Sequence, residues 1–192
     1  DIHIGPSIDL DDFDEILKLA LLQKPNRVVI TGDLIDKLAW LPQVCERLTT
    51  FAKQIPDGVD FILGNHEYHH DVNKVLDALK RNTPMNILVN SNIQIMGGKQ
   101  PVYIAGVAYD NDRKKDNREA MINKALSGIP DYAFVILLAH HPEFFEESIE
   151  RKIPLTLSGH THGGQIVFMG MPLVPTGTPY TKGRYVEEQS VC

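Results

Sequence analysis

The sequence has little cysteine, no long apolar run and no excess of basic residues. Its two cysteines, Cys45 and Cys192, are too few for a disulfide framework, although a single bridge between them is left open. The longest apolar run, residues 133–139, is far shorter than the ~18–20 residues that span a bilayer. With 19 basic against 25 acidic residues and no basic stripe, specific nucleic-acid binding is not expected.

The remaining composition is typical of a folded domain. Of the 192 residues, 43% are hydrophobic, which is too many for a disordered chain. One domain over residues 1–192 is expected. The first residue is Asp1 rather than methionine, so residues are expected to be missing upstream, and the domain is expected to be incomplete at its C-terminal end as well. The expected location is therefore cytoplasmic or peripheral to a membrane, and an anchor upstream of the chain is left open.

Strand-like and helix-like segments alternate along the chain, which predicts an α/β fold. Apolar residues at helical spacing predict helices, and short β-branched runs predict strands. A turn at Gly97 and Gly98 is expected to join two of the strands. Residues 110–118 are expected to form an exposed loop and a helix start, and residues 175–180 a loop near the rim of the site. The predicted helices are 9–23, 41–54, 72–79 and 116–126, and the predicted strands are 27–31, 60–63, 87–89, 93–96, 102–107, 133–139 and 155–158.

Polar side chains follow four of the predicted strands directly. In open α/β sheets ligands bind beyond the carboxyl ends of the strands, so these side chains are expected to meet at one rim. Carboxylate, amide and imidazole donors suit divalent first-row metals, and the donors outnumber those of one tetrahedral ion. A site for two metals is therefore predicted. The polar positions are Asp33 after Gly32, Asn65 and His66 after Gly64, His140 after Ala139, and His160 and His162 after Gly159, together with Asp1 and His3 at the start of the chain.

Three of these residues also have a structural interpretation when taken alone. Asp33 could cap a helix, Asn65 could be an ordinary turn residue, and His140 could be a hydrogen-bonded core histidine. His141 is interpreted as structural. It is the co-occurrence of all the positions at strand ends, rather than any one of them, that favours metal binding.

The motifs in this order resemble those of the calcineurin-like metallophosphoesterases. They are Asp1-x-His3, Gly32-Asp33, Gly64-Asn65-His66-Glu67, His140 and Gly159-His160-Thr161-His162. The strings GDLID, GNHEY, LLAHHPE and GHTHGGQI are most similar to the bacterial branch typified by the YkuE and YaeI phosphodiesterases, which is related to the UDP-2,3-diacylglucosamine pyrophosphatases. The resemblance extends from Asp1 to about Tyr185.

This resemblance implies a four-layer α/β/β/α sandwich, in which two mixed sheets are flanked by helices. It also implies a dinuclear, metal-dependent phosphoesterase that hydrolyses a phosphodiester or pyrophosphate by in-line attack of a metal-bridging hydroxide. His66 would act at the leaving group without binding metal, and Asp36 or Glu67 would help to orient the imidazoles. The implied ligands are Asp1, His3 and His162 for the first ion, Asn65, His140 and His160 for the second, and Asp33 as the bridge.

The sequence leaves open which metal is bound, which substrate is used and whether the protein is an enzyme. Mn is the favoured metal, with Fe, Zn and Mg also compatible. The expected partner is a small phosphorylated substrate, for which lipid-linked pyrophosphate, cyclic nucleotide and small phosphodiester all stay open. The first alternative to an enzyme is a non-catalytic binding scaffold on the same fold, and the second is a structural protein with one metal.

Overall fold

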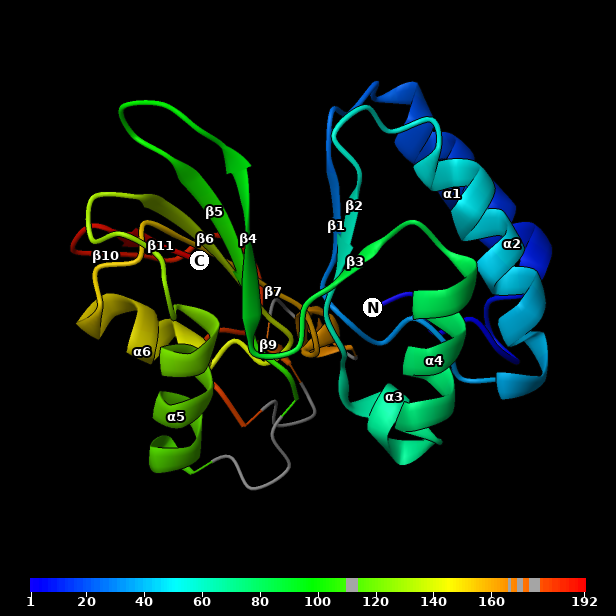
Figure 1. Cartoon of the computed structure of the whole chain (residues 1–192). Helices are drawn as coiled ribbons and strands as arrows, with labels where there is room; N and C mark the ends of the chain where they lie inside the picture. The colour runs from blue at the N-terminus through cyan, green and yellow to red at the C-terminus, as the bar shows by residue number, and fades with distance from the viewer. Residues whose placement is uncertain (110–113, 166, 169–170, 173–176) are drawn as a thin grey trace. The chain divides into compact units, whose positions relative to one another are not determined.

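The computed structural model describes residues 1–109, 114–165, 167–168, 171–172 and 177–192, with the backbone alone for 167–168 and 171–172. Parts of the two segments expected to be loops, residues 110–113 and 175–176, lie outside this description. The chain forms two compact units, residues 1–88 and 89–192 (Figure 1). The expectation of one domain over residues 1–192 stays a prediction.

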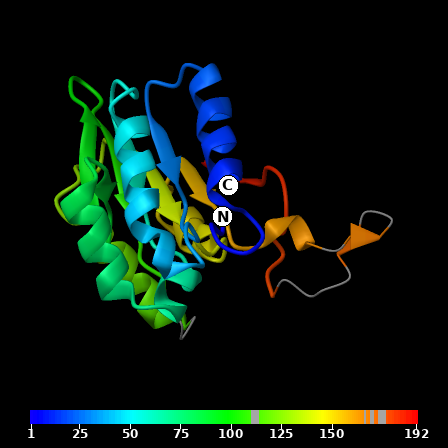
Figure 2. The ribbon, with the colours of Figure 1, turned by 90° about the vertical axis from the view of Figure 1, so that its right-hand side faces the viewer.

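The first unit is built on three parallel strands in the order β1-β2-β3. Its helices α1, α2 and α4 lie side by side in that order (Figure 2), and α2 contacts both of the others. The elements of this unit are α1 (Leu10–Leu22), β1 (Val28–Ile30), the 3-10 helix η1 (Leu38–Trp40), α2 (Leu41–Ala52), β2 (Val59–Phe61), α3 (Asn65–His69), α4 (Val72–Asn82) and β3 (Asn86–Ile87).

Local sequence signals explain where the helices of this unit begin. The Asp9 carboxylate accepts hydrogen bonds from the amides of Asp11 and Asp12, and Asp12 reciprocates, so α1 begins with a capping box. Asp71 caps α4 by accepting from the amide of Lys74. The core between helices and sheet consists of fully buried side chains, among them Phe13, Val44, Leu48, Phe61, Val75 and Leu79.

The second unit is built on a mixed sheet of six strands in the order β10-β11-β7-β6-β5-β4. The pairs β4–β5 and β10–β11 are antiparallel, and the other pairs are parallel. Its elements are β4 (Ser91–Met96), β5 (Val102–Gly106), α5 (Lys115–Ala125), β6 (Phe134–Ala139), α6 (Phe144–Glu150), β7 (Leu155–Ser158), the 3-10 helix η2 (His162–Gly164), β8 (Val167–Phe168), β9 (Met171–Pro172), β10 (Val186–Glu187) and β11 (Ser190–Val191).

Helices α5 and α6 pack against each other and cover the strands β5 and β6. The buried core there joins Val107 and Leu137 of the sheet region to Ile122 of α5 and Phe144 of α6. The expected α/β class, with two main sheets flanked by helices, is thus confirmed. Cys45 and Cys192 form no disulfide. In the described part of the chain, no helix combines the length and apolar character needed to cross a bilayer.

Candidate metal centre

The first unit places His3 beside the loop that follows β1. The amides of Ile2 and His3 both donate to the carbonyl of Asp33, at 2.8 and 3.0 Å. This pairing sets the imidazole Nε2 of His3 3.6 Å from the carboxylate Oδ2 of Asp33. Asp1 precedes Ile2 in this segment and is exposed. Two of the predicted ligands, His3 and Asp33, therefore have their donor atoms close together.

The second oxygen of Asp33 is held by the loop that follows β2. Its Oδ1 accepts a hydrogen bond of 2.9 Å from the amide of His66. Asn65 is buried and begins α3, directly before His66. The loops are so close that a Cβ on Gly64 would lie 2.5 Å from the Asp33 nitrogen and closer still to Oδ1. Glycine is therefore required at position 64 by close approach, not by its φ angle.

Glu67 joins these two loops through their backbones. Its side chain is fully buried and accepts from four amides, those of Asp33, Leu34, Ile35 and Gly64, at 2.7 to 3.3 Å. The expectation that Glu67 orients an imidazole is replaced by this role, in which it fixes the backbone that carries Asp33. Asp36 performs the expected role instead.

Asp36 contacts both imidazoles of the first unit. Its Oδ1 lies 2.7 Å from Nδ1 of His66 and 3.2 Å from Nδ1 of His3. The two rings meet edge to face with centroids 4.4 Å apart. Because an ionised carboxylate only accepts hydrogen bonds, these two contacts fit rings that carry a proton on Nδ1. Nε2 is then the reactive nitrogen of each ring, and that of His3 faces Asp33.

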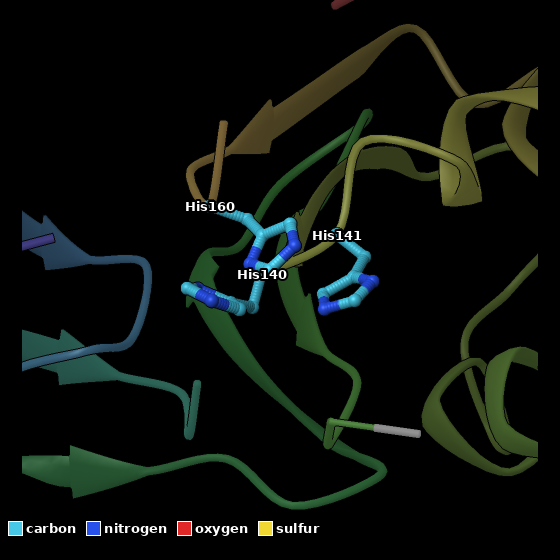
Figure 3. Close-up of side chains that lie close together, drawn as sticks. All are labelled: His140, His141 and His160. Atoms are coloured by element: carbon cyan, nitrogen blue, oxygen red, sulfur yellow. The ribbon is translucent and has the colours of Figure 1, made fainter. Parts of the chain in front are cut away.

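In the second unit, His140 and His160 come together at the ends of neighbouring strands. β6 and β7 are parallel, with Ala139 opposite Ser158, and the amide of Gly159 donates to the carbonyl of His140 at 3.1 Å. The ring centroids of His140 and His160 are 5.1 Å apart (Figure 3). His162 lies in η2 and is exposed.

His141 belongs to the same group, although the sequence suggested a purely structural role. Its ring stacks on that of His160, with centroids 3.9 Å apart and planes inclined by 20°. One potential ligand atom from each of His140, His141 and His160 lies within 4.8 Å of the others. The sequence signal was the doublet His140-His141, of which only His140 was interpreted as a ligand because the family resemblance places the ligand two residues before the proline.

Four of the predicted ligands share an unusual backbone conformation. Among the described residues, nine non-glycine residues have positive φ, and they include His3 (57°), Asp33 (50°), His160 (71°) and His162 (50°). Residues held in this region cost about 1–3 kcal/mol each and cluster at functional sites. Four of the nine positions are thus predicted ligands, and the other five lie at other residues of the described chain.

The donor atoms of each unit fit divalent metals. An ion about 2.0–2.2 Å from each ligand separates neighbouring donors by roughly 3–4 Å, close to the 3.6 Å between His3 Nε2 and Asp33 Oδ2. The nitrogen and carboxylate donors of the first unit suit Mn, Fe or Zn, and the imidazoles of the second suit Zn, Fe or Co.

Comparison with known proteins now identifies the class to which this fold and these donors belong. Residues 1–164 match the family model of the calcineurin-like phosphoesterases. The chain therefore belongs to the calcineurin-like metallophosphoesterase family, as its motifs suggested. The family is one of metal-dependent phosphohydrolases.

Individual relatives support the same assignment. The chain is 36% identical to an uncharacterized metallophosphoesterase of Campylobacter jejuni, over 96% of this chain and 48% of the relative. It is 32% identical to one of Aquifex aeolicus, over 91% of this chain and 65% of the relative, and 29% identical to YkuE of Bacillus subtilis, over 96% and 65%. The chain thus spans less than two thirds of the length of these relatives.

Proposed function

We propose that this chain is the catalytic domain of a dinuclear metal-dependent phosphoesterase that cleaves phosphodiesters or pyrophosphates. The observation that carries the proposal is the arrangement around Asp36, which engages Nδ1 of both His3 and His66. One carboxylate thereby prepares a metal-binding imidazole and a proton-donating imidazole together. Family membership supports the reaction class.

The proposed metal ligands are those of the sequence motifs. Asp1, His3 and His162 would hold one ion, Asn65, His140 and His160 the other, and Asp33 would bridge them. Two divalent ions, when bound, would lower the pKa of a water molecule toward neutrality and neutralise charge on the phosphate. Mn is the favoured metal, with Fe, Zn and Mg as further candidates.

His66 is the proposed catalytic residue. Its side chain is about one third exposed (34%), so a substrate can reach it, while Asp36 holds its Nδ1 at 2.7 Å. Nε2 would donate a proton to the departing oxygen, and Asp36 would stabilise the positive charge on the ring before that transfer. Proton donation by an oriented histidine contributes about 10²–10⁴-fold to a rate.

The roles of Asp33 and His66 can be separated by one set of variants. Hydrolysis of bis(p-nitrophenyl) phosphate with added Mn²⁺ is expected in the wild type, and metal content of about two ions per chain is expected by elemental analysis. His66→Ala should lower kcat about 10²-fold or more and still bind metal, whereas Asp33→Asn should lose both the hydrolytic activity and the bound metal. Asp57→Asn, the same change at an exposed carboxylate, is the control.

The same measurements test the alternatives. Two bound ions without hydrolysis of any diester or pyrophosphate would identify a binding scaffold, and one ion without hydrolysis would identify a structural metal. The physiological substrate, including a lipid-linked pyrophosphate, would be sought by screening phosphorylated metabolites and lipid precursors.

Association with a membrane through a segment outside this chain stays a prediction. A relative in Danio rerio, 30% identical over 86% of this chain, is named a transmembrane protein with a metallophosphoesterase domain.

A further inference from the structure

The end of β6 presents two consecutive imidazoles to the same place. Within a strand His140 and His141 would point to opposite faces, but β6 ends at Ala139 and the alternation no longer applies. Their ring centroids are 5.5 Å apart, and His160 lies closer to each of them, at 5.1 and 3.9 Å (Figure 3). Three imidazoles from two strand ends therefore form one group.

His141 is buried beside a carboxylate that lies on one side of its ring, at a distance longer than a hydrogen bond. Its ring is almost fully buried, and Nδ1 lies 3.8 Å from Oε2 of Glu143. Histidine ligands commonly have a carboxylate near the nitrogen that does not bind the metal, which fixes the ring and makes the other nitrogen a better donor. Glu143 lies on the Nδ1 side of the ring, so Nε2 is the nitrogen that the proposal assigns to the metal.

We propose that His141 is a third imidazole ligand of the ion held by His140 and His160. The inference rests on the proposed function only in that these two residues bind a metal. One potential ligand atom from each residue lies within 4.8 Å of the others. Because the rings of His141 and His160 are stacked, ligation of one ion by both requires one ring to turn about its side-chain bonds, away from the stacked position. Nitrogen-rich sites favour Zn²⁺ or Co²⁺ over Mg²⁺, so Zn²⁺ is the metal used to test this ligand set.

Ring stacking is the competing explanation for the position of His141. Its ring is nearly parallel to that of His160 and also lies 5.1 Å from that of Tyr109. Stacking requires an aromatic ring at position 141, whereas ligation requires a nitrogen. Phenylalanine supplies the first without the second, so substitution distinguishes the two explanations.

The test compares His141→Ala and His141→Phe with the wild type and with His70→Ala, which removes an exposed histidine. Zn²⁺ affinity is measured in the full chain by competition with a chromophoric chelator, and folding by far-UV circular dichroism. Ligation predicts that both His141 variants bind one ion about tenfold more weakly or worse, while the control matches the wild type. Wild-type affinity in His141→Phe would overturn the proposal in favour of stacking.

A second measurement on the wild type holds even if the substituted chains fail to fold. In protein labelled with ¹⁵N-histidine and loaded with ¹¹³Cd²⁺, a ligating imidazole shows a ¹¹³Cd–¹⁵N coupling. Coupling from His141 as well as from His140 and His160 would support the proposal, and coupling from the latter two alone would overturn it. Neither result depends on hydrolysis, so a chain that binds cadmium through three histidines without cleaving phosphoesters would refute only the proposed function.

Discussion

Glu67→Gln is expected to destabilise the first unit strongly, although it changes only one oxygen to an NH₂ group. In the native chain Oε1 accepts from the amides of Leu34 and Ile35, and Oε2 accepts from those of Asp33 and Gly64. Glutamine has a single accepting oxygen, so it can serve only one of these two pairs. Its NH₂ group would face the other two amides, and donors would then oppose donors.

The magnitude follows from the number of bonds lost. A hydrogen bond to a charged group contributes about 1.5–3 kcal/mol, so losing two lowers the free energy of unfolding by about 3–6 kcal/mol. Domains have about 5–15 kcal/mol in total. With a urea dependence of about 1–3 kcal/mol per molar, a loss of 3 kcal/mol lowers the unfolding midpoint by about 1–3 M.

Trp40 gives a direct assay, because it is the only tryptophan of the chain and belongs to the first unit. Its fluorescence is followed during urea unfolding of the wild type, Glu67→Gln and Glu46→Gln. Glu46 is exposed on α2, so its substitution is expected to change stability by less than about 0.5 kcal/mol. Equal midpoints for the two variants would refute the argument that the buried carboxylate holds the loops.

Three further substitutions test other contacts. Gly64→Ala should lower both the thermal unfolding midpoint and the Mn²⁺ affinity, because the added Cβ clashes with Asp33. Gly97→Ala is the control, because its Cβ would make only ordinary contacts. An unchanged Mn²⁺ affinity in Gly64→Ala would contradict the prediction. Burial is the main cause that raises the pKa of Glu147, so the folded chain binds its proton more readily and stability from this group should fall as pH rises from about 4.5 through the folded pKa. Glu147→Gln should flatten that dependence in urea titrations, and an unchanged slope would contradict it. Asp60→Ala should lower the free energy of unfolding, followed by Trp40 fluorescence, by about 3–5 kcal/mol because it removes the buried carboxylate that pairs with Arg27, and a loss below about 1 kcal/mol would disprove that estimate.

The regular elements were predictable because their signals are local. The apolar spacing of residues 9–23 and 41–54 predicted α1 and α2, and the run 133–139 predicted β6. Helix α6 was missed although its buried Phe144, Phe145 and Ser148 have helical spacing. Helix α3 has five residues, too few for such a pattern to show.

The site was predictable as a set of residue types and not as a set of contacts. Placing donors after strands follows from the general behaviour of α/β sheets, and the motif order adds the family. The role of Glu67 could not be predicted, because the four amides that donate to it belong to two loops that meet only after β1 and β2 pair. The proximity of His141 depends likewise on where β6 ends, which sequence periodicity does not fix within a residue or two.

The left-handed backbone at His3, Asp33, His160 and His162 also bears on how such proteins could be engineered. Glycine adopts this conformation without penalty, so a ligand-to-glycine exchange at one of these positions would relax the main chain while deleting a donor. A screen that rewards thermostability alone would therefore select against the chemistry. Grafting the centre onto another scaffold requires copying these main-chain angles before any side chain is chosen.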